Sequence, residues 1–125
     1  MKTIIKTNNA PAPIGPYSQA VLSGNMLFIS GQVAIVPETG SPMLDDIQSE
    51  THQVMKNITA ILKEAGMDMS HVVKASIFLM DMGQFLQVNA VYGSYFKSDF
   101  PARETIQVSK LPLNVNVEIS MIAIK

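Results

Sequence analysis

Only two stretches of this chain carry apolar side chains at the three- and four-residue steps typical of helices, and most of the remainder alternates with a period of two. The first stretch, residues 46–65, is predicted to form a helix that Asp45 or Asp46 caps and Gly66 ends. Its apolar face comprises Ile47, Val54, Ile58, Ile61 and Ala65. A chain with so little helical periodicity must build most of its fold from a sheet.

The second helical stretch opens at Asp81, where Gln84 occupies the third position of a predicted capping box. Pro101 lies just beyond the expected end of this helix. We expect its apolar face to comprise Phe85, Val88, Tyr92 and Phe96.

Six further segments have the alternation or composition of strands. They are residues 3–6, 19–22, 26–30, 72–80, 103–108 and 115–124. Within the fourth segment we expect Val73, Ala75, Ile77 and Leu79 to share one face. The length of 125 residues suits a single domain, 1–125. The order of elements predicts an α+β fold, in which two helices pack on one face of a mixed six-stranded sheet.

The other face of such a sheet has no third helix to cover it. Hydrophobic residues make up 47% of the chain and the mean hydropathy is +0.22, which is high for a small monomer. Self-association through the uncovered face would account for this surplus, and an apolar-rich core is the alternative.

Charge and composition exclude several classes of protein. The formal net charge of -1 argues against a nucleic-acid binder. The absence of cysteine excludes a disulfide scaffold, a thiolate zinc site and a cysteine nucleophile. No segment has the ~20 apolar residues of a membrane span, and no secretory signal opens the chain, so we expect a cytoplasmic location. His52 and His71 lack metal-ligand spacing, so we expect no metal site and interpret both histidines as surface or structural residues.

Arg103 is the single arginine among eight lysines, and it opens a predicted strand after Phe100-Pro101-Ala102. A guanidinium can hold a carboxylate through two parallel hydrogen bonds, so Arg103 is a candidate anion clamp. A solvated arginine at a strand end is the alternative interpretation.

Glu118 is a carboxylate in an otherwise apolar strand, where it must be paired, lie near a wet cavity or reach water at the strand end. Asn89 interrupts the apolar face of the second helix, and its amide needs hydrogen-bond partners. Tyr17 and Ser30 place hydroxyl groups beside sharp backbone features, where a structural role is the simpler interpretation.

Five collinear segments together resemble the reactive intermediate deaminase (RidA) family. They are Ala12 to Ala20, Phe28-Ile29-Ser30-Gly31-Gln32, Val88 to Tyr92 with Tyr95-Phe96, Phe100-Pro101-Ala102-Arg103, and Leu111-Pro112 with Val117-Glu118-Ile119. The resemblance covers essentially the whole chain.

The resemblance implies a chorismate-mutase-like fold assembled as a homotrimer, with active sites in clefts between subunits. It also implies hydrolysis of reactive enamines and imines, such as 2-aminoacrylate, to a 2-oxo acid and ammonia. Pyridoxal-phosphate dehydratases release these intermediates, and the family itself uses no metal or cofactor. A protonated imine carbon is already electrophilic, so orientation, one placed water and proton transfer suffice.

The resemblance also assigns roles to individual residues. Arg103 is expected to bind the substrate carboxylate, and Glu118 to hold or polarise the attacking water. The backbone at Gly31 and the Ser30 hydroxyl are expected to lie beside the substrate, while Tyr17 shapes the pocket. Asn89 is expected to have a supporting role.

Two departures from the family pattern bear on substrate preference. Thr105 stands where some members have a cysteine, which removes any thiol chemistry but keeps a hydroxyl at this substrate-binding position. Leu113-Asn114 replaces the lysine or glycine often found after Leu111-Pro112.

Other functions are weighed against imine hydrolysis. A non-catalytic regulatory or chaperone-like protein that binds a small carboxylate, such as a 2-oxo acid, would use the same clamp without placing a water. A ribonuclease would need a basic track and acid–base groups that the net charge and the two separated histidines do not offer. A chorismate mutase would need a cluster of cations around its dianionic substrate.

Overall fold

The computed structural model describes residues 1–125 and contains the two helices and six strands that the sequence predicts. The helices are α1 (Ile47–Glu64) and α2 (Phe85–Gly93), and the 3₁₀ turns are η1 (Met69–His71), η2 (Met82–Gln84) and η3 (Pro112–Asn114). The strands are β1 (Lys2–Ile5), β2 (Ala20–Ser23), β3 (Met26–Gln32), β4 (Val72–Leu79), β5 (Ala102–Gln107) and β6 (Val117–Ile124). No helix is both long and apolar enough to span a membrane.

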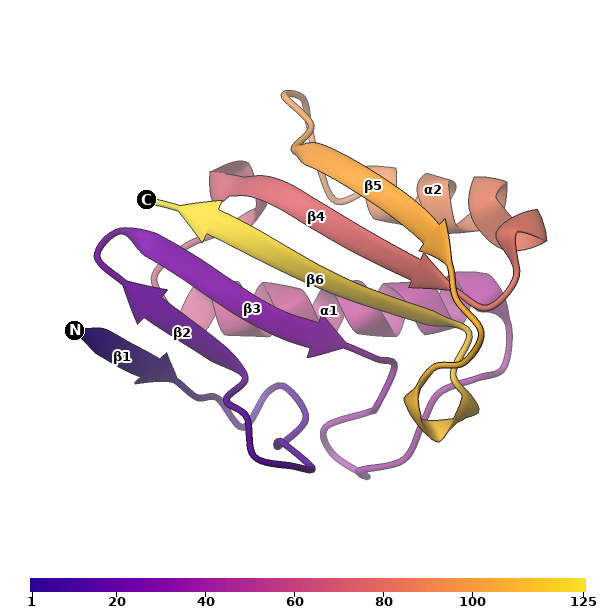
Figure 1. The fold of residues 1–125 in the computed structure, drawn as a ribbon, viewed down its shortest axis with the longest axis horizontal. Coiled ribbons are helices and arrows are strands. Elements are labelled where there is room, and N and C mark those ends of the chain that lie inside the picture. Colours follow the sequence, from indigo (N-terminus) through magenta and orange to yellow (C-terminus); the bar gives the residue numbers. More distant parts are fainter.

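All six strands form one sheet in the order β1-β2-β3-β6-β4-β5 (Figure 1). The C-terminal strand β6 therefore lies inside the sheet, antiparallel to β3 on one side and to β4 on the other. Only β4 and β5 are parallel, and α2 forms the crossover that a parallel pair requires. The prediction of an α+β fold with a mixed six-stranded sheet is confirmed.

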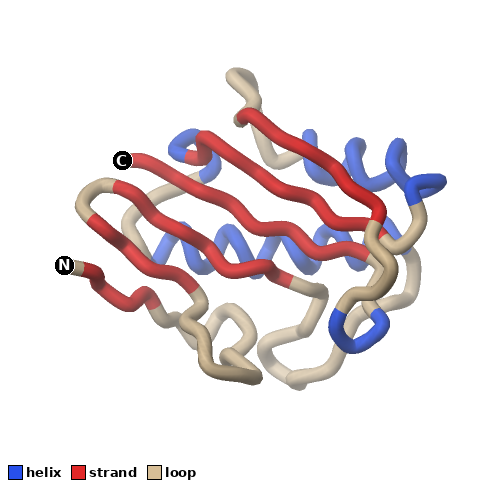
Figure 2. Tube along the Cα trace, viewed as in Figure 1, coloured by secondary structure: helices blue, strands red, loops and turns tan.

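Both helices lie on the same side of the sheet, as predicted (Figure 2). The apolar face of α1 packs onto the strands, and Val54, Ile58 and Ile61 are fully buried there. Asp46 caps α1 by accepting a hydrogen bond from the Ser49 N–H at 2.7 Å, which lowers the pKa of the Asp46 carboxyl. Gly66 follows the helix with φ +73°, a conformation that favours glycine.

The opposite face of the sheet has no covering layer within the chain. Strand pairing aligns Ile4, Val21, Phe28 and Ile122 across four strands of this face, and Phe78 pairs with Ile106 further along it. Phe28 and Ile106 are 42% and 47% exposed. We call this the open face.

One prediction about β4 is wrong. Val73 is exposed, whereas Val72, Ala75, Ile77 and Leu79 are buried. The register between β4 and β6 shifts between Val72 and Lys74, and the extra residue of this bulge turns Val73 outward.

The capping box predicted at Asp81 is also wrong. Asp81 accepts from the Gly83 N–H and caps the short turn η2, while α2 begins after Gln84 with no side-chain cap. The 3₁₀ turn η2 delays the start of α2 to Phe85. Asp81 and Gln84 therefore lie before the helix and cannot form a capping box for it.

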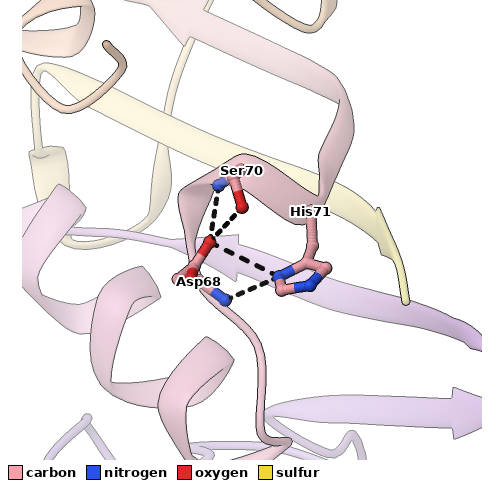
Figure 3. Close-up of polar contacts among 3 residues, drawn as sticks. All are labelled: Asp68, Ser70 and His71. Atoms are coloured by element: carbon pink, nitrogen blue, oxygen red, sulfur yellow. Dashed lines mark hydrogen bonds and ion pairs between the residues drawn. The ribbon is translucent and has the colours of Figure 1, made fainter.

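A capping box does exist at η1, between Asp68 and His71 (Figure 3). Asp68 accepts from the N–H and hydroxyl of Ser70, and its own N–H donates to Nδ1 of His71 at 3.0 Å. The Asp68 pKa is lowered chiefly by the hydrogen bonds from Ser70. These contacts give His71 a structural role at the end of η1.

Candidate active site

Arg103 lies on β5, at the edge of the sheet, and points to the side that the helices cover. It pairs with Ala75, a fully buried core residue, and residues paired across strands share a face. Its Nη1 donates to Oδ1 of Asn89 on α2 at 2.8 Å. The amide of Asn89 thus has the partner that its position in an apolar helix face required.

Two aromatic rings of α2 flank the same guanidinium. The central carbon of Arg103 lies 5.7 Å from the ring centroid of Phe85 and 5.1 Å from that of Tyr92. Phe85, Asn89 and Tyr92 are spaced by four and three residues, so one stripe of α2 holds the cation. The sequence analysis assigned Phe85 and Tyr92 only to an apolar helix face, although their spacing around Asn89 was visible.

Arg103 opens onto a hollow of about 320 Å³ beside α2. The hollow is lined by Asn89, Tyr92, Gly93, Phe100, Pro101 and Arg103. Asn89 is the only hydrogen-bond partner of the guanidinium in the chain, and no carboxylate forms an ion pair with it. A half-buried cation with an open fork beside a hollow is suited to receive an anionic group.

Thr105 follows Arg103 by two residues on β5 and therefore shares its face. Its hydroxyl is buried without a hydrogen-bond partner, and so is that of Tyr92. Burial raises the pKa of Tyr92, and the nearby Arg103 charge opposes this shift. We call Arg103, Asn89, Tyr92 and Thr105 the cationic half-site.

Glu118 lies on the other face of the sheet. It pairs with Phe78 on β4, which belongs to the open face. Burial raises the pKa of the Glu118 carboxyl above its usual value near 4.5, as expected for an acid in an apolar strand without a cationic partner.

A bulge in β3 brings Gly31 against Glu118. The register between β3 and β6 shifts between Ile29 and Gln32, so Ser30 and Gly31 together face Ser120. A Cβ atom at Gly31 would collide with the Glu118 carboxylate, so a larger residue there would force this side chain to move. This close approach explains the Ser30-Gly31 pair singled out in the sequence.

Ser30 and Tyr17 join this second group through the N-terminal loop. The Ser30 hydroxyl donates to the Ser18 carbonyl at 2.6 Å, and the Tyr17 hydroxyl accepts from the Ile14 N–H at 3.3 Å. Tyr17 and Gly31 both line a small hollow of about 20 Å³. We call Tyr17, Ser30, Gly31 and Glu118 the acidic half-site.

Gln19 holds the loop that carries Tyr17. Its buried side chain accepts from the Thr7 N–H and donates to the carbonyls of Thr7, Ala10 and Pro11, at 2.8–3.2 Å. The proline-rich segment has no regular structure of its own, and this amide supplies four of the hydrogen bonds that hold it. In the sequence, Gln19 belongs to a motif and opens a predicted strand, and neither feature indicates this anchoring role.

Within one chain the predicted site residues thus form two groups on opposite faces of the sheet. Arg103, Asn89 and Thr105 lie together under α2, and Tyr17, Ser30, Gly31 and Glu118 lie together at the β3 bulge and the N-terminal loop. The structure contains no group of three or more histidine, cysteine, aspartate or glutamate side chains placed to hold a metal ion.

Relatives of this chain are found across bacteria, archaea and eukaryotes. A RutC family protein of Pyrococcus horikoshii is 50% identical over all of this chain and 99% of its own length. Reactive Intermediate Deaminase A of Arabidopsis thaliana, a chloroplastic protein, is 46% identical over 98% of this chain and 65% of its own length. Human 2-iminobutanoate/2-iminopropanoate deaminase is 43% identical over all of this chain and 91% of its own length.

Solved structures share the fold. The E. coli yjgF gene product is 40% identical, with a TM-score of 0.94 and 98% of each chain covered. E. coli TdcF with bound serine is 36% identical, with a TM-score of 0.95 and 98% of each chain covered. The family model described as Endoribonuclease L-PSP matches residues 7–125. The chain therefore belongs to the Endoribonuclease L-PSP family, which includes the RutC and reactive intermediate deaminase proteins.

Proposed function

We propose that this protein hydrolyses reactive enamines and imines of the 2-aminoacrylate and 2-iminopropionate type to 2-oxo acids and ammonia. The observation that carries the proposal is the open guanidinium fork of Arg103, held by Asn89 beside a hollow and lacking a carboxylate partner. Two relatives bear the names of deaminases, and TdcF was solved with serine, a small carboxylate, bound.

The reaction needs one water molecule and yields one ammonia. Arg103 holds the substrate carboxylate, and Glu118 accepts a proton from water as its oxygen attacks the protonated imine carbon. Glu118 then gives this proton to the carbinolamine nitrogen, the C–N bond breaks, and ammonia leaves as the hydroxyl group passes its own proton to Glu118 and the C=O bond forms. The raised pKa of Glu118 makes its carboxylate a better proton acceptor than an ordinary glutamate.

The two half-sites have to meet for this chemistry, and one chain holds them on opposite faces of its sheet. We propose a homotrimer in which the acidic half-site of one subunit faces the cationic half-site of its neighbour. Such contacts would also cover the apolar open face, which includes Phe28 and Ile106.

Complementation between impaired variants tests the function and the shared cleft together. Arg103→Ala and Glu118→Gln are each assayed with a threonine dehydratase that supplies fresh imine, while oxo-acid release is followed. Arg103→Ala alone should be inactive, and Glu118→Gln alone should retain only a low residual activity. When the two are denatured, mixed equally and refolded, about one-quarter of the clefts should combine an intact Arg103 with an intact Glu118 and restore activity.

Two results would contradict the proposal in different ways. Failure of the mixture to regain activity, with active refolded wild type as the control, would mean that the cleft is not shared between subunits. A wild-type protein that does not accelerate hydrolysis of any imine would refute the deaminase function, and binding of 2-oxo acids by that protein would then indicate a sensor.

A further inference from the structure

Glu50 is a fully buried carboxylate that the reaction described above does not use. It lies in the first turn of α1 and has no exposed surface. No lysine, arginine or histidine forms an ion pair with it. A buried charge without a counter-ion is costly unless hydrogen bonds satisfy its oxygens.

Three donors from one short segment satisfy both oxygens of Glu50. Oε2 accepts from the backbone N–H groups of Asn116 and Val117 at 2.7 and 3.2 Å, and Oε1 accepts from the Asn116 side-chain amide at 2.7 Å. These contacts join residues 66 and 67 positions apart in the chain. Glu118 is the next residue after Val117.

On the edge that faces β3, Asn116 and Val117 have no strand partner. The last β3 residue paired with β6 is Gln32, opposite Ile119, so β3 does not reach Asn116 and Val117. The preceding turn is also strained, since Leu113 and Asn114 have φ values of 58° and 54°. On the other edge, the Met80 N–H donates to the Asn116 carbonyl at 3.1 Å.

We propose that Glu50 is a positioning residue that fixes the start of β6 and thereby sets the Glu118 carboxylate against Gly31. The Glu118 carboxylate lies directly against Gly31, where it occupies the space that a Cβ atom would take. Because Glu118 follows Val117 on β6, a small displacement of this strand end moves the carboxylate relative to Gly31. The inference rests on the proposed function in one respect, namely that Glu118 holds the attacking water.

Steady-state kinetics with Glu50→Gln tests the proposal. The amide keeps the side-chain shape but turns an NH₂ group toward backbone donors, so at least one bond to the segment is lost. We expect kcat to fall about 10- to 100-fold. KM should change less than about threefold, because Arg103 lies on the other face of the sheet. Exposed Glu64→Gln, on the same helix, is the matched control and should match wild type.

A double-mutant cycle separates positioning from general destabilisation. In a Glu118→Gln background, Glu50→Gln should lower the residual kcat no further, because the carboxylate that it positions is gone. The proposal would be overturned if Glu50→Gln lowered kcat by the same factor in both backgrounds, or if it left kcat unchanged in the wild-type background. Should Glu50→Gln fail to fold, Asn116→Ala, which removes only the bond to Oε1, takes its place in the cycle.

Amide NMR spectra keep this inference separate from the deaminase function. If wild type proves inactive on imines, the deaminase proposal fails, yet Glu50→Gln should still shift the amide resonances of Gly31 and Glu118 and leave that of Arg103 in place. Unchanged Gly31 and Glu118 resonances would refute the positioning role whatever the activity.

Discussion

At the scale of single residues, the arrangement around Arg103 explains why this position carries the chain's only arginine. Asn89 fixes one nitrogen of the guanidinium, and the rings of Phe85 and Tyr92 flank its plane at 5.7 and 5.1 Å. A lysine ammonium has no planar fork and cannot donate to Asn89 Oδ1 while also presenting two parallel donors to a carboxylate.

Arg103→Lys should therefore lower kcat/KM for imine hydrolysis by about 100-fold, mainly through a higher KM. The coupled dehydratase assay measures this change. Lys110→Arg, at an exposed position, is the matched control and should retain wild-type kinetics. Near-normal kinetics in Arg103→Lys would mean that charge alone, rather than the fork, binds the substrate.

Glu118 should make the protein less stable as the pH rises. Burial raises its folded pKa, so between the ordinary value near 4.5 and the folded value the native state binds more protons than the unfolded chain. The stabilising contribution is complete below the ordinary value and is lost as pH rises through the folded pKa. Glu118→Gln should thus raise Tm at pH 7 while greatly reducing turnover, and this gain in Tm should disappear at about pH 4.

Thermal unfolding at matched protein concentration across this pH range checks the sign. A Glu118→Gln variant that is less stable than wild type at pH 7 would contradict burial as the cause of the shift. The same comparison with exposed Glu64→Gln should give no pH-dependent gain.

At the scale of elements, the Gln19 side chain holds the proline-rich segment before β2. Gln19→Ala removes four hydrogen bonds to Thr7, Ala10 and Pro11, and should lower the free energy of unfolding by about 1–3 kcal/mol. Gln19→Glu should lower the free energy of unfolding at least as much, since a carboxylate cannot donate to the three carbonyls. Denaturant unfolding measures the change, and amide exchange of residues 7–17 should accelerate in both variants.

At the scale of the whole molecule, the open face predicts an assembly. Ile106→Glu places a charge among apolar side chains of this face, and should produce a monomer without imine hydrolysis. Leu86→Glu, at a 79% exposed position on α2, should leave the assembly intact. Sedimentation velocity reports the mass of each variant, and an Ile106→Glu protein that assembles like wild type would contradict an interface on this face.

Apolar spacing and capping residues act over a few positions, so they were sufficient to predict most helices and strands. The spacing of apolar residues gave both helices, and Asp46 and Gly66 gave the ends of the first. These patterns gave wrong predictions at two places. At Val73 a β-bulge adds an extra residue to the pairing of β4 with β6, and at Asp81 a 3₁₀ turn precedes the helix. Bulges depend on how two distant strands pair, which no local pattern records.

The sequence by itself determined which side chains can do chemistry here: one guanidinium, one carboxylate in an apolar strand, and a glycine beside a serine. Only the tertiary structure decided that these groups divide between two faces of a sheet, because β6 inserts between β3 and β4 and the strand order is not the chain order. The hydrogen bonds from Asn116 and Val117 to Glu50 likewise join residues far apart in the chain. Such contacts exist only once the whole sheet has formed, since the cost of burying a charge is met by partners that folding alone brings to it.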